Sequence, residues 1–239
     1  MRLEPLGDAA LIIELAGGID TDSLARVRDT VARLEHAAIP GITDLVPGYA
    51  SVAVHYDPLR VLGDAPRACV AASPSALMRQ AISAALDGAG HPGAVAPSRN
   101  VEIPVAYGGE HGPDLAHVAA QHGLTCDEVV ALHTGATYLV HMIGFVPGFP
   151  YLGGLDPRLE TPRRDTPRPA VPAGSVGIGG AQTGIYPIES PGGWQLIGRT
   201  PLSLFDAMHD EPARLRVGDC VTFTAITGAE YARLATEGA

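Results

Sequence analysis

The chain has 239 residues, of which 46% are hydrophobic and 18% are charged, and its formal net charge is −10. This length accommodates one large domain or two small ones, and the apolar content suffices for a sizeable core. An acidic chain without a long basic block is a poor partner for nucleic acid, so we expect none. No apolar stretch approaches the roughly 20 residues of a membrane span, so we expect a soluble, cytoplasmic protein without a membrane partner.

Two residue types exclude further classes of protein. All 16 basic residues are arginine, and the chain has no lysine. A Walker A loop, a Schiff-base enzyme and a covalent biotin carrier each need a lysine, so this chain is none of these. The three cysteines, Cys69, Cys126 and Cys220, are far apart and form no CxxC pair. We therefore expect no disulfide framework and no metal site, and cysteines that pack as small apolar residues.

The first part of the chain predicts a small domain over residues 1–90. Its candidate elements are a strand at Ala9–Leu15, a helix with Leu24, Val27, Val31 and Leu34 on one face, strands at Ile42–Val46 and Ser51–Tyr56, and a helix that opens at Ser73 and Pro74. Apolar residues at helical spacing and a Ser-Pro helix start support the two helices. The order strand, helix, strand, strand, helix is typical of a split βαβ, ferredoxin-like domain.

Residues 91–100 carry two prolines and little to bury, which indicates a linker to a second domain over residues 101–239. Candidate elements there are a strand at Val101–Ala106, helices at Pro113–His122 and Cys126–His133, and strands at Tyr138–Phe145, Ser175–Ile178, Trp194–Gly198 and Cys220–Ala225. Thr125 and Glu128 form a capping box before the second helix. Short strands separated by Gly and Pro favour a barrel, so the expected fold class is α+β.

The run from Phe145 to Arg199 holds 11 glycines and 9 prolines among 55 residues, against 50 of 239 for the whole chain. Such a composition alone would suggest disorder. However, 5 of the chain's 12 aromatic residues lie in this run, and disordered segments lack aromatic residues. The glycines and prolines therefore fix loop conformations in an ordered segment that builds the functional site.

Arginines crowd the middle of this run, and arginine forks suit a carboxylate or a phosphate. Prolines at 157, 162, 167 and 169 lie in and beside the sequence TPRRDTPR and would hold its guanidinium groups in place before a ligand arrives. The alternative is that these arginines form local ion pairs with Asp156, Glu160 and Asp165. Both interpretations remain open on the sequence alone.

Two motifs in the run resemble catalytic or cofactor-binding sequences but do not fit them. AGSVG around Ser175 lacks the first glycine of a nucleophile elbow and the helix that should follow it. GSVGIGG has Gln182 where the dinucleotide fingerprint needs its third glycine. We interpret these glycines as the end of a strand whose backbone is approached closely by another group.

The candidate site residues are polar and aromatic side chains of the run together with one histidine before it. Glu189 is the only carboxylate between Asp165 and Asp206, which makes it the first candidate for a base or an acid that binds ligand. His141 can serve as an acid or base or simply pack in its strand, and Trp194 can be a ligand platform or part of the core. The predicted catalytic residues are Glu189, Tyr186 and His141, and the predicted substrate- or anion-binding residues are Arg163, Arg164, Arg168, Gln182, Ser190, Trp194 and Arg199.

The same run resembles a known family over its whole length. Ile143–Asp206 is similar to the central motif of the 5-oxoprolinase B-subunit family, which is also called allophanate hydrolase subunit 1, carboxyltransferase subdomain C/D or KipI-like. The segments VPGYASVAVHYDP, IPVAYGGEHGPDL and VGDCVTF match the family in the same order, so the resemblance covers nearly the whole chain.

The resemblance implies a ferredoxin-like first domain and a cyclophilin-like β-barrel second domain. It implies a protein that works with the A and C subunits of a 5-oxoprolinase to convert 5-oxo-L-proline to L-glutamate with hydrolysis of ATP. We expect the chain to be inactive alone. It provides no established catalytic residue. Two relatives of the family keep other functions open: inhibition of a histidine kinase, and a carboxyltransferase of a urea- or amide-carboxylating system whose biotin arrives on another chain.

Overall fold

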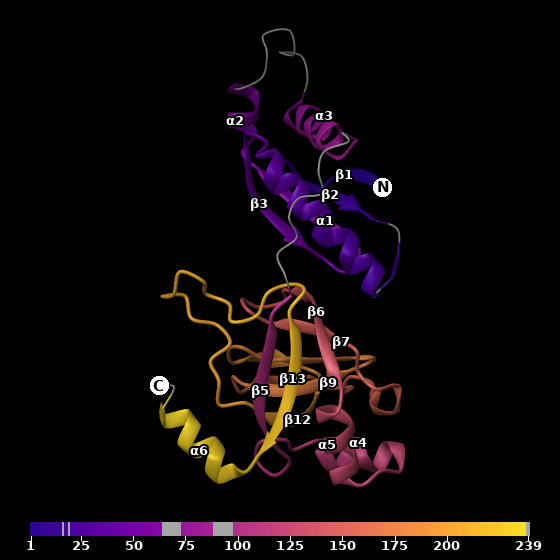
Figure 1. Cartoon of the computed structure of the whole chain (residues 1–239), viewed down its shortest axis with the longest axis vertical. Coiled ribbons are helices and arrows are strands. Elements are labelled where there is room, and N and C mark those ends of the chain that lie inside the picture. The colour runs from indigo at the N-terminus through magenta and orange to yellow at the C-terminus, as the bar shows by residue number, and fades with distance from the viewer. Residues whose placement is uncertain (16, 19, 64–72, 88–97, 238–239) are drawn as a thin grey trace. The chain divides into compact units, whose positions relative to one another are not determined.

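The computed structural model describes residues 1–15, 17–18, 20–63, 73–87 and 98–237. The chain divides into two compact units, Met1–Pro97 and Ser98–Ala239 (Figure 1). Residues 91–97 of the predicted linker lie outside the described residues, and Asn100 already belongs to the first strand of the second unit. Among the described residues, no helix is long and apolar enough to cross a membrane.

The first unit is a four-stranded antiparallel sheet packed against helices. Its elements are β1 (Arg2–Pro5), β2 (Ala10–Glu14), α1 (Thr21–Ala37), β3 (Ile42–Pro47), β4 (Ser51–Tyr56), α2 (Pro58–Gly63) and α3 (Pro74–Asp87). The strand order is β1-β2-β4-β3, and each neighbouring pair is antiparallel. Strand β1 was not predicted, and no parallel pair of the kind that a βαβ unit forms is present in the described part of this sheet. The ferredoxin-like assignment stays a prediction.

The predicted apolar face of α1 is confirmed in this unit. Leu24, Val27 and Leu34 are buried, and Val31 is half-buried against the same core. Asp20 caps the helix by accepting a 2.7 Å hydrogen bond from the backbone N–H of Ser23, and this hydrogen bond lowers the pKa of its carboxyl. The core of the unit therefore follows the helical spacing of the sequence.

The second unit is a closed seven-stranded barrel with α4 and α5 packed side by side (Figure 1). Its elements are β5 (Asn100–Tyr107), α4 (Leu115–His122), α5 (Cys126–Thr134), β6 (Thr137–Ile143), β7 (Pro150–Gly153), η2 (Pro157–Leu159), β8 (Arg168–Val171), β9 (Ser175–Gly179), β10 (Gln182–Ile185), β11 (Ser190–Gly192), β12 (Gln195–Arg199), β13 (Cys220–Ile226) and α6 (Gly228–Glu237). The strand order around the barrel is β10-β7-β6-β13-β5-β12-β9, while β11 and β8 form a separate pair. This α+β architecture is consistent with the expected cyclophilin-like barrel.

A chain of hydrogen bonds crosses the interior of the second unit, which contains the fully buried His133. The Thr183 hydroxyl donates to the carbonyl of Gly177 at 3.0 Å, so it accepts from His133 Nε2, also at 3.0 Å. His133 Nδ1 then accepts from the Tyr107 hydroxyl at 2.8 Å. Burial lowers the pKa of His133 to about 3, so the ring is neutral at neutral pH.

Two sequence expectations in this unit are corrected by the structure. The strand predicted to run to Phe145 ends at Ile143, because Phe145 has a φ of 69°, which no strand residue adopts. Cys126, expected to be buried, is exposed as the first residue of α5, while Cys220 is half-buried and Cys69 lies outside the described residues. The capping box of Thr125 and Glu128 is confirmed.

Candidate functional site

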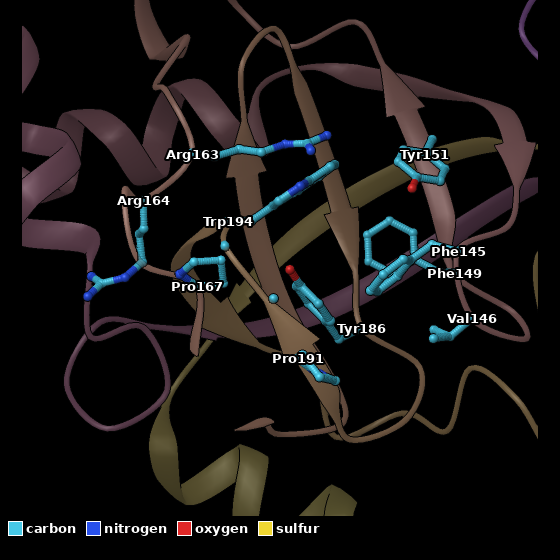
Figure 2. Close-up of a pocket in the computed structure, with 12 residues that line it drawn as sticks. Phe145, Val146, Phe149, Tyr151, Arg163, Arg164, Pro167, Tyr186, Pro191 and Trp194 are labelled. Carbon is cyan, nitrogen blue, oxygen red and sulfur yellow. The ribbon is translucent and has the colours of Figure 1, made fainter. Parts of the chain in front are cut away.

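The second unit carries a pocket of about 420 Å³ on the predicted Gly- and Pro-rich run (Figure 2). Its walls come from the turn after β6, from β7, from the loop between η2 and β8, and from the segment that joins β10 to β12. A volume of this size is typical of small-molecule sites. The pocket is lined by Phe145, Val146, Phe149, Tyr151, Arg163, Arg164, Pro167, Tyr186, Pro191, Gly192, Gly193 and Trp194.

Aromatic rings that meet edge to face form one wall of the pocket. The buried ring of Phe149 lies 5.1 Å from that of Tyr186 and 5.5 Å from that of Trp194, at interplanar angles of 83° and 89°. Edge-to-face contacts of this kind favour a single arrangement of the rings. Phe145 meets Phe149 in the same way at 5.6 Å, but its side chain is 61% exposed at the rim, on a backbone with positive φ.

Glycines make room for these rings on the strands. A Cβ atom added at Gly179 would come within 2.6 Å of the Trp194 indole, and one added at Gly192 within 2.3 Å of the Tyr186 hydroxyl oxygen. Real Cβ atoms do not approach other atoms so closely, so only glycine fits unless the rings move. The interpretation of GSVGIGG as a strand end approached closely by another group is confirmed at Gly179, where the group is the indole of Trp194.

Arg163 stands over the face of this indole. Its Cζ atom lies 5.8 Å from the centre of the Trp194 ring, within the range of a cation–π contact. Trp194 is only 5% exposed, whereas Arg163 is exposed and has no carboxylate partner among the residues that the structure describes. Its guanidinium is therefore available to an anion at the mouth of an aromatic pocket.

Arg164 and Arg168 have a different role from Arg163. Arg168 Nη2 lies 2.8 Å and Arg164 Nη1 lies 3.3 Å from Oδ1 of Asp114, a buried carboxylate at the start of α4. The local pairing that the sequence left open is found instead at Arg158, whose side chain binds Asp156 at 2.7 Å. These hydrogen bonds lower the pKa of Asp156 to about 2.

The Tyr186 hydroxyl is held inside the pocket wall. It accepts a hydrogen bond from the backbone N–H of Trp194, and burial raises the pKa of the phenol above its usual value. Tyr186 is therefore a neutral phenol at neutral pH, able to donate its proton to a ligand or a neighbour.

The structure brings together four of the predicted site residues, Tyr186, Trp194, Arg163 and Arg164, and places the others outside the pocket lining. Arg168 binds Asp114, and Arg199 donates from Nε to the carbonyl of Ala173 at 2.8 Å. Glu189 is exposed between β10 and β11, and Ser190 is buried at the start of β11. Gln182 is half-buried at the start of β10, and His141 is buried with its ring against Gly153. No group of histidine, cysteine, aspartate and glutamate suited to a metal ion occurs in the part of the chain that the structure describes.

Sequence reasoning missed two kinds of residue at the site: aromatic residues that line the pocket, and a buried carboxylate that binds two of its arginines. Phe145, Phe149 and Tyr151 were noticed as a sign of order but not as site residues, although an aromatic cluster beside paired arginines would have suggested them. Asp114 lies outside the run, immediately before a helix, where an aspartate is expected to act as a helix cap.

Comparison with known proteins places this architecture in a family. The carboxyltransferase domain, subdomain C and D, matches residues 1–215. The 5-oxoprolinase B subunit of Bacillus subtilis (strain 168) is 43% identical over 96% of this chain and 95% of its own length, and that of Escherichia coli O157:H7 is 45% identical over 91% and 93%.

A solved structure agrees with these matches. The crystal structure of TTHA0988 superposes with a TM-score of 0.75 at 36% identity over 92% of this chain. The chain spans 40% of the length of that protein. The chain thus belongs to the 5-oxoprolinase B-subunit family of carboxyltransferase subdomain C and D proteins.

Proposed function

We propose that this chain is the B subunit of an ATP-dependent 5-oxoprolinase, which converts 5-oxo-L-proline to L-glutamate together with its A and C subunits. The two bacterial relatives of matching length support this function. The observation in the structure that favours it most is the guanidinium of Arg163, which lies over Trp194 at the mouth of an aromatic pocket and binds no carboxylate of the described residues.

The proposed ligand is a small lactam ring that bears one carboxylate. Its ring atoms suit the aromatic wall of Phe149, Tyr186 and Trp194, and its carboxylate suits the guanidinium of Arg163. The Tyr186 phenol, kept neutral by burial, is a donor for the lactam oxygen. The pocket thus has a partner for the ring, the carboxylate and the lactam oxygen of 5-oxoproline.

ATP is needed because an unstrained lactam resists hydrolysis. We propose that the lactam oxygen is phosphorylated by ATP, with release of ADP. Water then adds to the ring carbon and the C–N bond breaks, which gives γ-glutamyl phosphate. A second water hydrolyses this acyl phosphate to glutamate and phosphate. The chain itself has no lysine for a Walker A loop, so we place the main nucleotide contacts on the partner subunits.

The test is reconstitution. The chain is mixed with the A and C subunits of its enzyme, 5-oxo-L-proline and ATP, and the formation of L-glutamate and ADP is measured. We expect product from the complete mixture and none from this chain alone or from the mixture without it. Equal glutamate formation in the absence of this chain would refute the proposed function.

A further inference from the structure

Asp114 occupies the N-cap position of α4, yet its side chain makes no capping bond to that helix. Its carboxylate is instead directed to the pocket wall and is only 5% exposed. Oδ2 accepts from the backbone N–H of Leu196 at 2.7 Å, while Oδ1 accepts from Arg168 and Arg164. The backbone N–H of Asp114 also donates to the carbonyl of Leu196 at 2.9 Å. One buried carboxylate thus joins strand β12 to the segment 161–168, which carries Arg163, Arg164 and Arg168 and is called the arginine loop below.

Further hydrogen bonds tie this loop to the same strand segment on both sides of Arg163. The carbonyl of Pro162 accepts from Gln195 Nε2 at 3.0 Å, and the backbone N–H of Arg164 donates to the carbonyl of Gly193 at 2.7 Å. Arg163 lies between Pro162 and Arg164, as Trp194 lies between Gly193 and Gln195. The guanidinium and the indole are therefore held opposite each other by bonds between their chain neighbours.

Asp114 also bears on the charge beside the pocket. Arg163, Arg164 and Arg168 are three cations within six residues, and cations crowded near one pocket repel one another. The Asp114 carboxylate neutralises part of this charge from a buried position, where electrostatic interactions are stronger than in water. Arg163 does not bind this carboxylate and stays available to the ligand.

We propose that Asp114 is a positioning residue of the pocket: by holding Arg164, Arg168 and the Leu196 backbone, it keeps the Arg163 guanidinium over Trp194 for an anionic ligand. The part of this inference that concerns substrate rests on the proposed function. The part that concerns the pocket does not, because it can be measured on the ligand-free chain.

The chain offers a built-in reporter, since Trp194 is its single tryptophan. It also offers a matched control. Asp219 is a second buried carboxylate of the same unit, 3% exposed, which accepts from Arg99 Nε at 3.0 Å and from the backbone N–H of Arg216 at 2.8 Å. Asp219 is not part of the pocket lining. Asp114→Asn and Asp219→Asn remove the same charge from the same kind of site.

The experiment compares Trp194 emission and its quenching by acrylamide in the wild type and the two variants, each checked for folding by thermal unfolding. We expect Asp114→Asn to shift the emission to longer wavelength and to increase quenching, and Asp219→Asn to leave both unchanged. In the reconstituted enzyme we expect Asp114→Asn to raise KM for 5-oxoproline about tenfold with little change in kcat, because a loosened Arg163 loses ground-state binding.

Unchanged emission and quenching in Asp114→Asn, or equal changes in Asp219→Asn, would overturn the inference. If Asp114→Asn fails to fold, Arg164→Gln removes the same ion pair at its more exposed partner. A Trp194 emission identical to that of the wild type in this variant would then overturn the inference. A wild-type assembly that makes no glutamate would count against the proposed function, while the fluorescence comparison would still decide the role of Asp114.

Discussion

The barrel interior and the pocket are both aromatic clusters with polar groups among them, but they treat those groups differently. In the interior, the Tyr107 hydroxyl, the His133 ring and the Thr183 hydroxyl form one hydrogen-bonded chain that ends on the carbonyl of Gly177. At the pocket, Arg163 has an aromatic face beneath it and no carboxylate beside it among the described residues. A satisfied polar chain stabilises the fold, whereas a cation without an anionic partner is suited to a ligand.

The largest effect on stability should come from breaking the hydrogen-bonded chain of Tyr107, His133 and Thr183 in the barrel interior. His133→Ala removes a fully buried ring and leaves the Tyr107 hydroxyl without its acceptor, so we expect the free energy of unfolding to fall by about 3–5 kcal/mol. The exposed His117 of α4 provides the control, and His117→Ala should change stability by less than about 0.5 kcal/mol. Urea unfolding measures both free energies. Equal losses of unfolding free energy in the two variants would show that the hydrogen bonds of His133 have no special role in stability.

The same histidine should make stability depend on pH. Its pKa is about 3 in the folded chain and near 6.5 when unfolded, so between these values the unfolded state binds the extra proton. Stability should therefore fall as the pH is lowered from 6.5, by up to about 1.4 kcal/mol per pH unit from this group. Urea unfolding of the wild type and of His133→Gln at several pH values isolates this contribution as a difference in slope. Identical slopes would contradict a neutral, buried His133.

A smaller effect is expected where the pocket wall meets the barrel. Gly179→Ala places a Cβ within 2.6 Å of the Trp194 indole, so the ring must shift, at a cost of about 1–3 kcal/mol in unfolding free energy. We also expect an altered Trp194 emission spectrum. Gly228→Ala is the control, because a Cβ there meets nothing within 4 Å. An unchanged emission spectrum in Gly179→Ala would show that the indole does not lie against this strand.

The smallest effect on stability, and the most specific effect on function, should come from Arg163. Arg163→Gln removes an exposed charge that forms no ion pair with the described residues, so unfolding free energy should change by less than about 0.5 kcal/mol. The KM for 5-oxoproline in the reconstituted enzyme should rise about tenfold or more. Arg158→Gln, in the same loop region but paired with Asp156, should leave KM unchanged. If both variants behave alike, the ligand does not use Arg163.

Much of the fold was predictable because local patterns dominate it. The apolar face of α1, the capping box of α5 and the strands around Ser175 and Cys220 all follow from residues close together in the sequence. The short strands β7, β8, β10 and β11 were not predicted. They are three or four residues long, too short for a pattern to mark them, and pairing with other strands makes them extended.

The site was predictable in composition more than in geometry. Tyr186, Trp194, Arg163 and Arg164 were named and do line one pocket, while the roles of the candidates outside its lining, Glu189, His141, Gln182, Ser190, Arg168 and Arg199, stay predictions. Three arginines that look alike in TPRRDTPR differ in the structure, because Asp114 lies within reach of two of them and not of the third.

By itself, the sequence determined that the run from Phe145 to Arg199 is ordered and rich in arginine and aromatic residues, because composition decides which segments can pack and which chemical groups they carry. Only the tertiary structure decided which arginine stays available. That choice depends on a carboxylate about 50 residues away, brought to the loop by the packing of α4 against β12. Ion pairs act over a few ångströms in space, and separation along the chain does not reveal them.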